Sequence, residues 1–345
     1  MIQTERVPLK ILVLCTVETG FDAIADFIRG GAQISGLIGL NPKIVNQLIV
    51  SGFSDVAIFA NKYDVNYRYV ESYDLSLESD IEIIKSMDFN LVWVAGWQRL
   101  VPSWLIKLSA NGVLGCHGSP DGIAGGRGRS PQNWALILGA NRFDLALFLI
   151  GTGVDDGPIV AQRSFAYLPG DDIRISYYRV SIAVSDMMRE IVSDPSILLT
   201  PKLQINQGFY LPKRNPEDGL VDWYQERNFI IRQCRALTHP YPGLHTYYKN
   251  IQIILWECAD FDDVINSEIG KVSTCFYTGE FLVNCKNGRV LVRKWTTNIE
   301  GWVPIQGMQL EGLSFKEQIN NIVERHKCKN HLQILSPRIT RWLLE

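Results

Sequence analysis

Short apolar runs alternate with amphipathic stretches along the chain up to Phe165. The runs predict buried strands at residues 10–15, 34–40, 91–95 and 113–114, with a further short apolar segment at residues 56–60. The amphipathic stretches predict helices at residues 21–29, 43–50, 77–87 and 102–110. This alternation is typical of an α/β fold with an open, mostly parallel, Rossmann-like sheet. Because ligands of such sheets bind beyond the carboxyl ends of the strands, we expect a site at the loops that begin at Trp97 and Cys116.

A different pattern follows in the second half of the chain. After a long helix at residues 171–193, the polar, turn-rich residues 212–219 are typical of a linker, and residues 223–237 are again helical. Short alternating segments then predict strands at residues 252–257, 270–277, 281–285 and 290–294, with a hairpin turn at residues 287–288. We therefore expect a larger domain (1–205), a linker (206–225), a smaller β-barrel-like domain of the OB type (226–312) and a helical tail (313–345).

Length and composition agree with a two-domain globular protein. The chain has 345 residues, 46% of them hydrophobic and 20% charged, and its formal net charge is −2. A single core rarely grows past about 250–300 residues, and a chain without a global basic field is not a typical nucleic-acid binder. The cysteines show neither a CxxC pair nor zinc-ligand spacing, which predicts reduced thiols and no metal site. Without a signal-peptide pattern or an apolar run of about 18 residues, we expect a cytoplasmic protein with no membrane span.

The most informative segment contains His117. It reads GCHGSP at residues 115–120, and GGRGRSP at 125–131 and NWAL at 133–136 follow. Gly115 is expected to end the strand at 113–114, which would place His117 just past a buried strand, at the ligand edge of the sheet. The glycines between Gly118 and Gly128 would let the backbone approach a substrate closely. The pattern is equally compatible with a histidine that only caps the strand above an ordinary loop.

A second segment, GTGVDDGPIVAQ at residues 151–162, places two adjacent acids in a tight loop before an apolar strand. Adjacent side chains point in different directions, so only one of Asp155 and Asp156 is expected to face a site. Spacing alone favours an Asx-type turn, in which the acid merely caps the bend.

Together, the two segments resemble the formyltetrahydrofolate-dependent formyltransferases. The family pattern runs Asn-x-His, Ser-Pro, Arg-Gly, Pro and Trp-Ala, and continues later with Asp-x-Gly-Pro-Ile and a Gln. This chain has, in that order, His117, Ser119, Pro120, Arg127-Gly128, Pro131, Trp134-Ala135, Asp155, Gly157-Pro158-Ile159 and Gln162. The resemblance covers residues 10–295, including a Pro-Tyr-Pro-Gly turn at 240–243, and it extends to two branches: the methionyl-tRNA formyltransferases and the formyltransferases of nucleotide-linked amino sugars. The tail beyond Gly312 has no counterpart in it.

The resemblance implies an enzyme that transfers a formyl group from 10-formyltetrahydrofolate to an amine, with the larger domain as its catalytic domain. Of the family's Asn, His and Asp, only His117 and Asp155 carry over, because Gly115 stands where the Asn is expected. A protonated His117 would donate to the oxyanion of the tetrahedral intermediate, and Asp155 would stabilise that imidazolium or take the amine's proton through water. Losing the Asn donor costs about 3 kcal/mol unless water, a backbone N–H, Asn133 or Gln98 replaces it.

The resemblance also places the two ligands. The folate is expected under the strand at 91–95 and along the loop after it, in contact with Trp97, Gln98, Leu100 and Val154, although Trp97 is equally expected in the core. The expected substrate-binding residues are Ser119, Arg127, Arg129, Lys213 and Arg214, since guanidinium groups suit the diphosphate of a nucleotide sugar. Solvated loop charge is an equally good interpretation of each of these cations taken singly.

Three interpretations of the acceptor compete. The favoured one is a nucleotide-linked amino sugar, used in the synthesis of cell-surface glycans such as the O-antigen of lipopolysaccharide. The second is the initiator tRNA of a methionyl-tRNA formyltransferase, which needs a basic loop where residues 121–126 read DGIAGG. The third is a folate-binding module that has lost catalysis together with the Asn. We therefore expect a nucleotide-sugar substrate, no nucleic-acid partner and no membrane, and a homodimer is left open.

Overall fold

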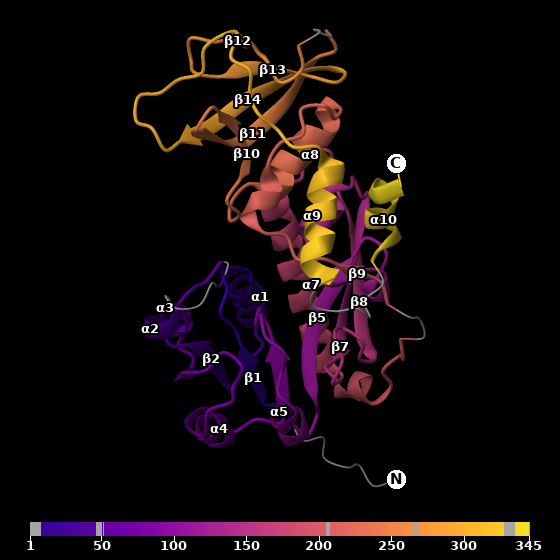
Figure 1. The fold of residues 1–345 in the computed structure, drawn as a ribbon. Helices are drawn as coiled ribbons and strands as arrows, with labels where there is room; N and C mark the ends of the chain where they lie inside the picture. Colours follow the sequence, from indigo (N-terminus) through magenta and orange to yellow (C-terminus); the bar gives the residue numbers. More distant parts are fainter. Residues whose placement is uncertain are drawn as a thin grey trace.

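The structure is a computed structural model that describes residues 8–45, 50, 52–204, 208–264, 268–327 and 335–344. Figure 1 shows a large α/β part (indigo to magenta), an antiparallel β part (orange) and two C-terminal helices (yellow) that lie against the rest. The expected fold class, a mostly parallel sheet with a smaller β domain, is confirmed. Within the described ranges, no helix is both long enough and apolar enough to span a bilayer.

A seven-stranded sheet with the order β3-β2-β1-β4-β5-β7-β8 forms the centre of the α/β part. Its strands are β1 (Ile11–Leu14), β2 (Gly36–Leu40), β3 (Tyr67–Val70), β4 (Leu91–Val94), β5 (Val113–Ser119), β7 (Arg142–Leu149) and β8 (Ile159–Ala166). The first five in that order pair in parallel, whereas β7 and β8 pair antiparallel. β3 and β7 were not predicted. The pattern missed β3 because this edge strand is only half buried and carries no apolar run.

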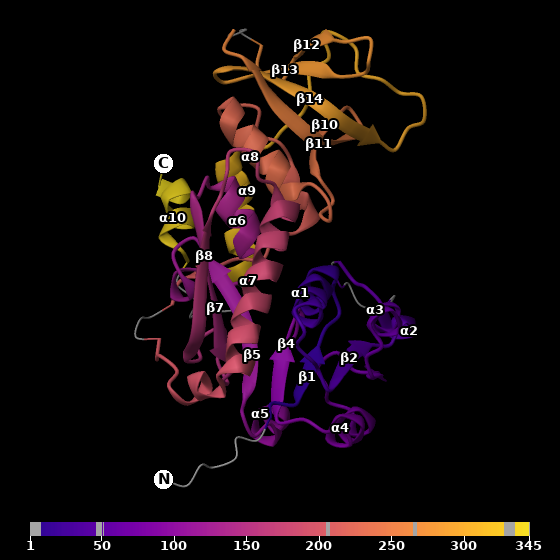
Figure 2. The same cartoon turned by 180° about the vertical axis from the view of Figure 1, so that it is seen from behind.

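Helices cover both faces of this sheet. They are α1 (Glu18–Arg29), α2 (Pro42–Val45), α3 (Val56–Tyr63), α4 (Glu78–Lys85), α5 (Ser103–Leu108), α6 (Pro131–Ile137) and α7 (Ile173–Ser193). Alternate residues of β1 enter the two resulting cores, with Ile11 and Val13 in the core under α1 and α7, and Leu12 and Leu14 in the core under α4 and α5. Figure 2 shows α7 beside α1 on the first face. The predicted helix at 43–50 begins as α2, and residues 46–49 lie outside the described residues.

β5 continues past the point where its strand was expected to end. The prediction stopped at Gly115, but the strand runs to Ser119, because the unpredicted β7 pairs with it along this length. Gly118 is required by this pairing, since a Cβ there would lie 2.5 Å from the carbonyl oxygen of Asp144. His117 therefore lies within a strand and not after one, which corrects the expectation.

The β part is a five-stranded antiparallel sheet with the order β10-β11-β14-β13-β12. Its strands are β10 (Leu244–Tyr248), β11 (Ile251–Asp262), β12 (Val272–Cys275), β13 (Phe281–Cys285) and β14 (Gly288–Thr297). The later residues Gln309 and Glu311 form antiparallel bridges with Lys271, beside β12, and with Tyr247 in β10. This segment thus bridges the two edge strands of the sheet, β10 and β12, and the sheet has the barrel-like form that was expected.

The C-terminal helices pack where the two parts meet. α8 (Arg227–Leu237) contacts both α6 and β11, and α9 (Phe315–Lys327) and α10 (Pro337–Leu344) lie beside it (Figure 1). The rings of Phe315 and Trp342 contact each other and Phe229 of α8. One buried cluster joins side chains of α6, α8, the antiparallel sheet and both tail helices. The tail is therefore part of the core of the protein.

The segment expected to be a linker is folded into the same region. Its short strand β9 (Tyr210–Leu211) pairs in parallel with β6 (Arg127–Gly128) in the glycine-rich loop. The 3-10 turn η3 (Pro216–Gly219) follows and contains the buried Asp218, whose carboxylate pairs with Arg325 of α9 at 2.5 Å. This segment consequently holds the glycine-rich loop and the tail together.

Candidate active site

β5 and the loop before β8 bring His117 and Asp155 together. Nδ1 of His117 lies 3.5 Å from Oδ2 of Asp155, and its Nε2 lies 2.7 Å from the carbonyl oxygen of Gly126. The histidine is 9% exposed. A carboxylate and a carbonyl oxygen are both acceptors, so each ring nitrogen faces a group to which an N–H can donate. The arrangement orients the imidazole between Asp155 and the glycine-rich loop.

The glycine-rich loop after β5 lies around this pair. The N–H of Gly128 donates to Oδ2 of Asp155 at 3.0 Å, while Gly126 faces the histidine. A Cβ on Gly126 would lie 2.5 Å from Cβ of Ser119, and Gly128 has a φ of +99°, a conformation that side chains disfavour. The close backbone approach expected from the glycines is therefore made to His117 and Asp155.

The backbone of Asp155 is held by a residue that the sequence did not single out. Nε2 of Gln204 donates to the carbonyl oxygens of Asp155, at 3.0 Å, and Gly157, at 2.8 Å. Oε1 of Gln204 accepts a hydrogen bond from Nη2 of Arg127 at 2.8 Å. Gln204 lies outside both sequence motifs, and only the fold shows that it reaches this loop.

The place of the family's Asn is filled by apolar side chains. A Cβ on Gly115 would lie 3.0 Å from Cδ1 and Cγ1 of Ile150 and 3.2 Å from Cζ of Phe148. Gly115 pairs with Phe148 across the antiparallel ladder, and paired residues of such strands share a face. Asn133 is not a substitute, because its buried amide donates to the carbonyl of Ala236 at 2.7 Å. A side chain at position 115 would therefore require Ile150 or Phe148 to move by a few tenths of an ångström.

Two of the expected substrate-binding residues are buried in the protein itself. Ser119 is fully buried, and its hydroxyl donates to the carbonyl of Gly122 at 2.6 Å. Arg127 is 8% exposed and turns toward Gln204. Both side chains thus shape the glycine-rich loop and the loop of Asp155.

The other three expected cations differ in their exposure. Arg214 stacks on Trp134, with 4.8 Å between its guanidinium carbon and the ring centre, and also donates to the carbonyl of Asp218. Burial lowers the pKa of Arg214 to about 10. Lys213 and Arg129 are exposed. Of the five expected residues, Lys213 and Arg129 are thus the exposed ones, and the other three are at least partly buried.

The loop after β4 lies at the carboxyl edge of the sheet, as expected. Trp97 is 6% exposed and packs edge-on against Tyr73, with ring centres 4.9 Å apart, so it belongs to the core. The N–H of Gln98 donates to the hydroxyl of Tyr73 at 3.0 Å. Leu100 is 69% exposed and Val154 is half-buried, which leaves apolar surface on both loops.

A small cleft of about 90 Å³ opens beside this loop, between the start of α1, Gln98, Tyr177 and Tyr241. The hydroxyls of Tyr177 and Tyr241 are hydrogen-bonded to each other. Burial raises the pKa of both tyrosines, and the charge of Arg129 partly opposes this at Tyr241. Arg129 therefore lies near the cleft, one residue after Gly128. Ligand pockets usually measure about 300–1,000 Å³, so the cleft suits a small group and not a whole folate.

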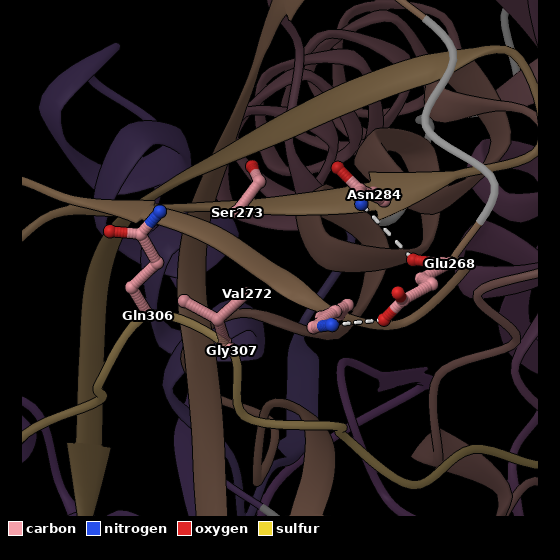
Figure 3. Close-up of a pocket in the computed structure, with 7 residues that line it drawn as sticks. Glu268, Val272, Ser273, Asn284, Gln306 and Gly307 are labelled. Carbon is pink, nitrogen blue, oxygen red and sulfur yellow. Dashed lines mark hydrogen bonds and ion pairs between the residues drawn. The ribbon is translucent and has the colours of Figure 1, made fainter.

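A larger cavity, of about 360 Å³, is lined by residues of β12, β13 and the segments beside them, in the β part, and Figure 1 shows these strands well away from β5. Figure 3 shows its polar lining, in which Nδ2 of Asn284 donates to the carbonyl of Glu268 at 3.0 Å. The carboxylate of Glu268 pairs with Lys271. The carboxylate of Glu268 is thus engaged by Lys271, and the lining residues contain no histidine–carboxylate pair like that of His117 and Asp155. Among the residues that the structure describes, no cluster of three His, Cys, Asp or Glu could hold a metal ion.

Fold and site together define an α/β enzyme with a histidine–aspartate pair under a glycine-rich loop. The chain belongs to the formyl transferase family: the family description "Formyl transferase" matches residues 29–192, and "Formyl transferase, C-terminal domain" matches residues 213–311. The predicted enzyme class, a formyltransferase, is confirmed at the level of this family. The tail helices lie beyond the matched residues.

Two curated relatives come from different branches. The bifunctional polymyxin resistance protein ArnA of Wigglesworthia glossinidia brevipalpis is 26% identical over 256 residues, which is 72% of this chain and 38% of that protein. The methionyl-tRNA formyltransferase of Geobacter sulfurreducens is 23% identical over 295 residues, which is 83% of this chain and 88% of that protein. The chain thus spans well under half the length of ArnA.

Solved structures share the fold at low sequence identity. HypX from Aquifex aeolicus has a TM-score of 0.62 at 16% identity, covering 92% of this chain and 48% of that one. An N-formyltransferase from Helicobacter canadensis, solved with folinic acid and dTDP-3-aminofucose, has a TM-score of 0.56 at 12% identity, covering 84% of this chain and 100% of that one.

Proposed function

We propose that this protein is a cytoplasmic enzyme that transfers the formyl group of 10-formyltetrahydrofolate to the amine of a nucleotide-linked amino sugar, for cell-surface glycan synthesis. The observation that carries the choice of acceptor is the charge of the glycine-rich loop. Within residues 121–126 the charged side chain is Asp121, which is bound by Arg338 of α10 at 2.6 and 2.7 Å. Of the two arginines that follow, Arg127 is buried and only Arg129 is exposed, so the loop offers a single exposed cation. A tRNA acceptor needs a basic surface at this position, because phosphate contacts supply most of its affinity.

His117 and Asp155 would carry the reaction. The amine attacks the formyl carbon, the carbonyl oxygen becomes negative, and the amine must lose a proton. His117 would stabilise the oxyanion with its Nε2–H, which the carbonyl of Gly126 now accepts and would have to release. Asp155 would stabilise the imidazolium through Nδ1. The proton lost by the amine passes to the departing folate nitrogen as the carbon–nitrogen bond breaks, so the pair ends the cycle unchanged.

The two ligands would approach from either side of this pair. The exposed Leu100 and the half-buried Val154 provide apolar surface for the folate ring, and the backbone of Gln98 borders it. Arg129 is the expected substrate cation that is both exposed and close to the cleft of Tyr241. We assign the diphosphate to Arg129, with catalysis in residues 1–205.

A methionyl-tRNA formyltransferase is the second candidate. The relative from Geobacter sulfurreducens supports it, because the match covers most of both chains. This candidate predicts tight, selective binding of initiator methionyl-tRNA at physiological salt, whereas the sugar enzyme should bind it no better than unrelated RNA.

The experiment presents both acceptors to the same preparation. Purified protein and 10-formyltetrahydrofolate are incubated with a panel of nucleotide-linked amino sugars and, separately, with charged initiator tRNA, and N-formyl products are measured by mass spectrometry. We expect a product with at least one amino sugar and none with the tRNA. Product with the tRNA alone would move the assignment to the second candidate, and transfer from formate and ATP without folate would refute the donor.

A further inference from the structure

We propose that Gln204 and Arg127 are positioning residues that direct the carboxylate of Asp155 at His117. The proposal rests on the function proposed above, in which Asp155 acts through the imidazole. It also changes the interpretation of Arg127, which the sequence suggested as a ligand of the substrate's diphosphate.

The first step of the argument is the conformation of the Asp155 loop. Asp155 has a φ of +49°, in the left-handed region that non-glycine residues rarely occupy. On one side the loop is pressed against β7, since a Cβ on Gly157 would lie 1.7 Å from the carbonyl oxygen of Leu149. On the other side the single amide of Gln204 binds the carbonyls of Asp155 and Gly157. Held on both sides, the backbone at Asp155 cannot rotate freely, and its carboxylate meets Nδ1 of His117 and the N–H of Gly128.

The second step is the orientation of the Gln204 amide. A guanidinium group has donors only, so the atom that Arg127 binds must be the amide oxygen. The amide nitrogen of Gln204 then faces the carbonyl oxygens of Asp155 and Gly157, to which it donates. Arg127 and the two carbonyl oxygens therefore select the same orientation of the Gln204 amide.

The third step is the burial of Arg127. The side chain is 8% exposed, and a Cβ on Gly208 would lie 2.6 Å from its Cδ and Cζ, so the guanidinium is packed into a space that only a glycine leaves open. Its Nε is buried without a hydrogen-bond partner among the described residues. Among the residues that the structure describes, this guanidinium donates to Gln204, and the hydrogen bonds of Gln204 lead on to Asp155.

The test uses the isosteric change Gln204→Glu, which keeps an oxygen for Arg127 but removes both donors to the loop. The matched control is Gln309→Glu, because Nε2 of Gln309 donates to the carbonyl of Ile269 at 2.8 Å in the β part, away from the site. We expect Gln204→Glu to lower kcat at least about tenfold while the KM values for both substrates change less than about twofold. Arg127→Met should behave likewise, and Arg127→Lys should recover part of the loss.

A double-mutant cycle separates positioning from general loss of structure. If Gln204 acts through Asp155, then Gln204→Glu should have almost no further effect in an Asp155→Ala background. An equal fold-loss in both backgrounds would overturn the proposal. A rise in the acceptor KM of Arg127→Met at unchanged kcat would instead return Arg127 to diphosphate binding.

The last readout needs no acceptor. The ring ¹⁵N resonances of His117, assigned by His117→Ala, should move in Gln204→Glu toward their positions in Asp155→Ala and stay unchanged in Gln309→Glu. The same measurement on Gln204→Met serves if the glutamate variant does not fold. If these resonances move but no amino sugar is formylated, the proposed function fails and the positioning stands. If transfer occurs but kcat and the resonances of both Gln204 variants match the control, the positioning fails.

Discussion

Gly115→Asn restores the side chain that the family pattern expects, and the structure indicates that it does not fit. The new Cβ would lie 3.0 Å from Ile150 and 3.2 Å from Phe148, closer than most such contacts, and the amide must extend beyond it. Overpacking of this kind costs about 1–3 kcal/mol. We therefore expect Gly115→Asn alone to lower the melting temperature by at least about 2 °C and to give no gain in turnover.

If the side chain of Ile150 is shortened, Gly115→Asn should raise turnover. Ile150→Ala opens space on the same face, at a stability cost of at most about 2 kcal/mol because the side chain is only half-buried. An added oxyanion donor contributes about 3 kcal/mol to transition-state stabilisation, which corresponds to a rise in kcat of about a hundredfold. The double variant Gly115→Asn/Ile150→Ala is therefore expected to exceed Ile150→Ala by up to that factor.

Four proteins decide this prediction: wild type, the two single variants and the double variant. Each is assayed for kcat under saturating folate and acceptor, and for its melting temperature. A faster Gly115→Asn variant with an unchanged melting temperature would refute the steric argument. A folded double variant no faster than Ile150→Ala would show that a missing donor does not limit the reaction. Product from the double variant but none from wild type would identify the natural protein as a folate-binding module.

Further predictions concern the catalytic pair, the tail and the β part. His117→Ala and Asp155→Ala should each lower kcat at least about a hundredfold with folate affinity retained by calorimetry, and losses that multiply in the double variant would contradict a shared action. Arg338→Ala removes the solvent-exposed ion pair with Asp121, so we expect the free energy of unfolding to fall by less than about 1 kcal/mol. Because Asp121 lies in the glycine-rich loop, kcat should nevertheless fall about threefold or more. An unchanged kcat would show that this loop does not need the tail. Hydrogen bonding to Arg289 lowers the pKa of Asp262, so this carboxylate stabilises the fold above its unfolded pKa of about 3.9 and loses that effect as the pH falls through its folded value. Urea denaturation should accordingly show Asp262→Asn less stable than wild type at neutral pH but equal to it in strong acid, and the same difference at both pH values would refute the assignment.

The fold class could be predicted from the sequence because the strands at the centre of the parallel sheet are apolar throughout. β1, β2 and β4 are buried on both faces, and such strands appear as continuous hydrophobic runs. β7 has the sequence RFDLALFL and begins only a few residues after α6 ends. The prediction did not separate this strand from the apolar helix before it. Because β7 was missed, the end of β5 was placed too early.

Part of the candidate site could be predicted, and the rest depends on contacts between distant segments. His117 and Asp155 were recognisable because each lies in a motif with glycine and proline at fixed positions. Gln204 carries no local signal, since an amide in a polar stretch is ordinary until the fold brings it to two carbonyls. The burial of Arg127 could not be predicted either, because a cation on a glycine-rich loop is usually solvated. In the structure its side chain packs against Gly208 and points into the protein.

The contact between Arg338 and Asp121 has a consequence for the order of events during synthesis. These residues are 217 positions apart, so the glycine-rich loop leaves the ribosome long before its partner has been made. At about 5–20 residues per second, the interval is about 10 to 40 s. Throughout that time the sheet can form, but the loop over His117 lacks one of its anchors, and so does the core around Phe229 that the tail helices complete. A nascent chain of this enzyme therefore anchors the loop over His117 only after α10 has left the ribosome.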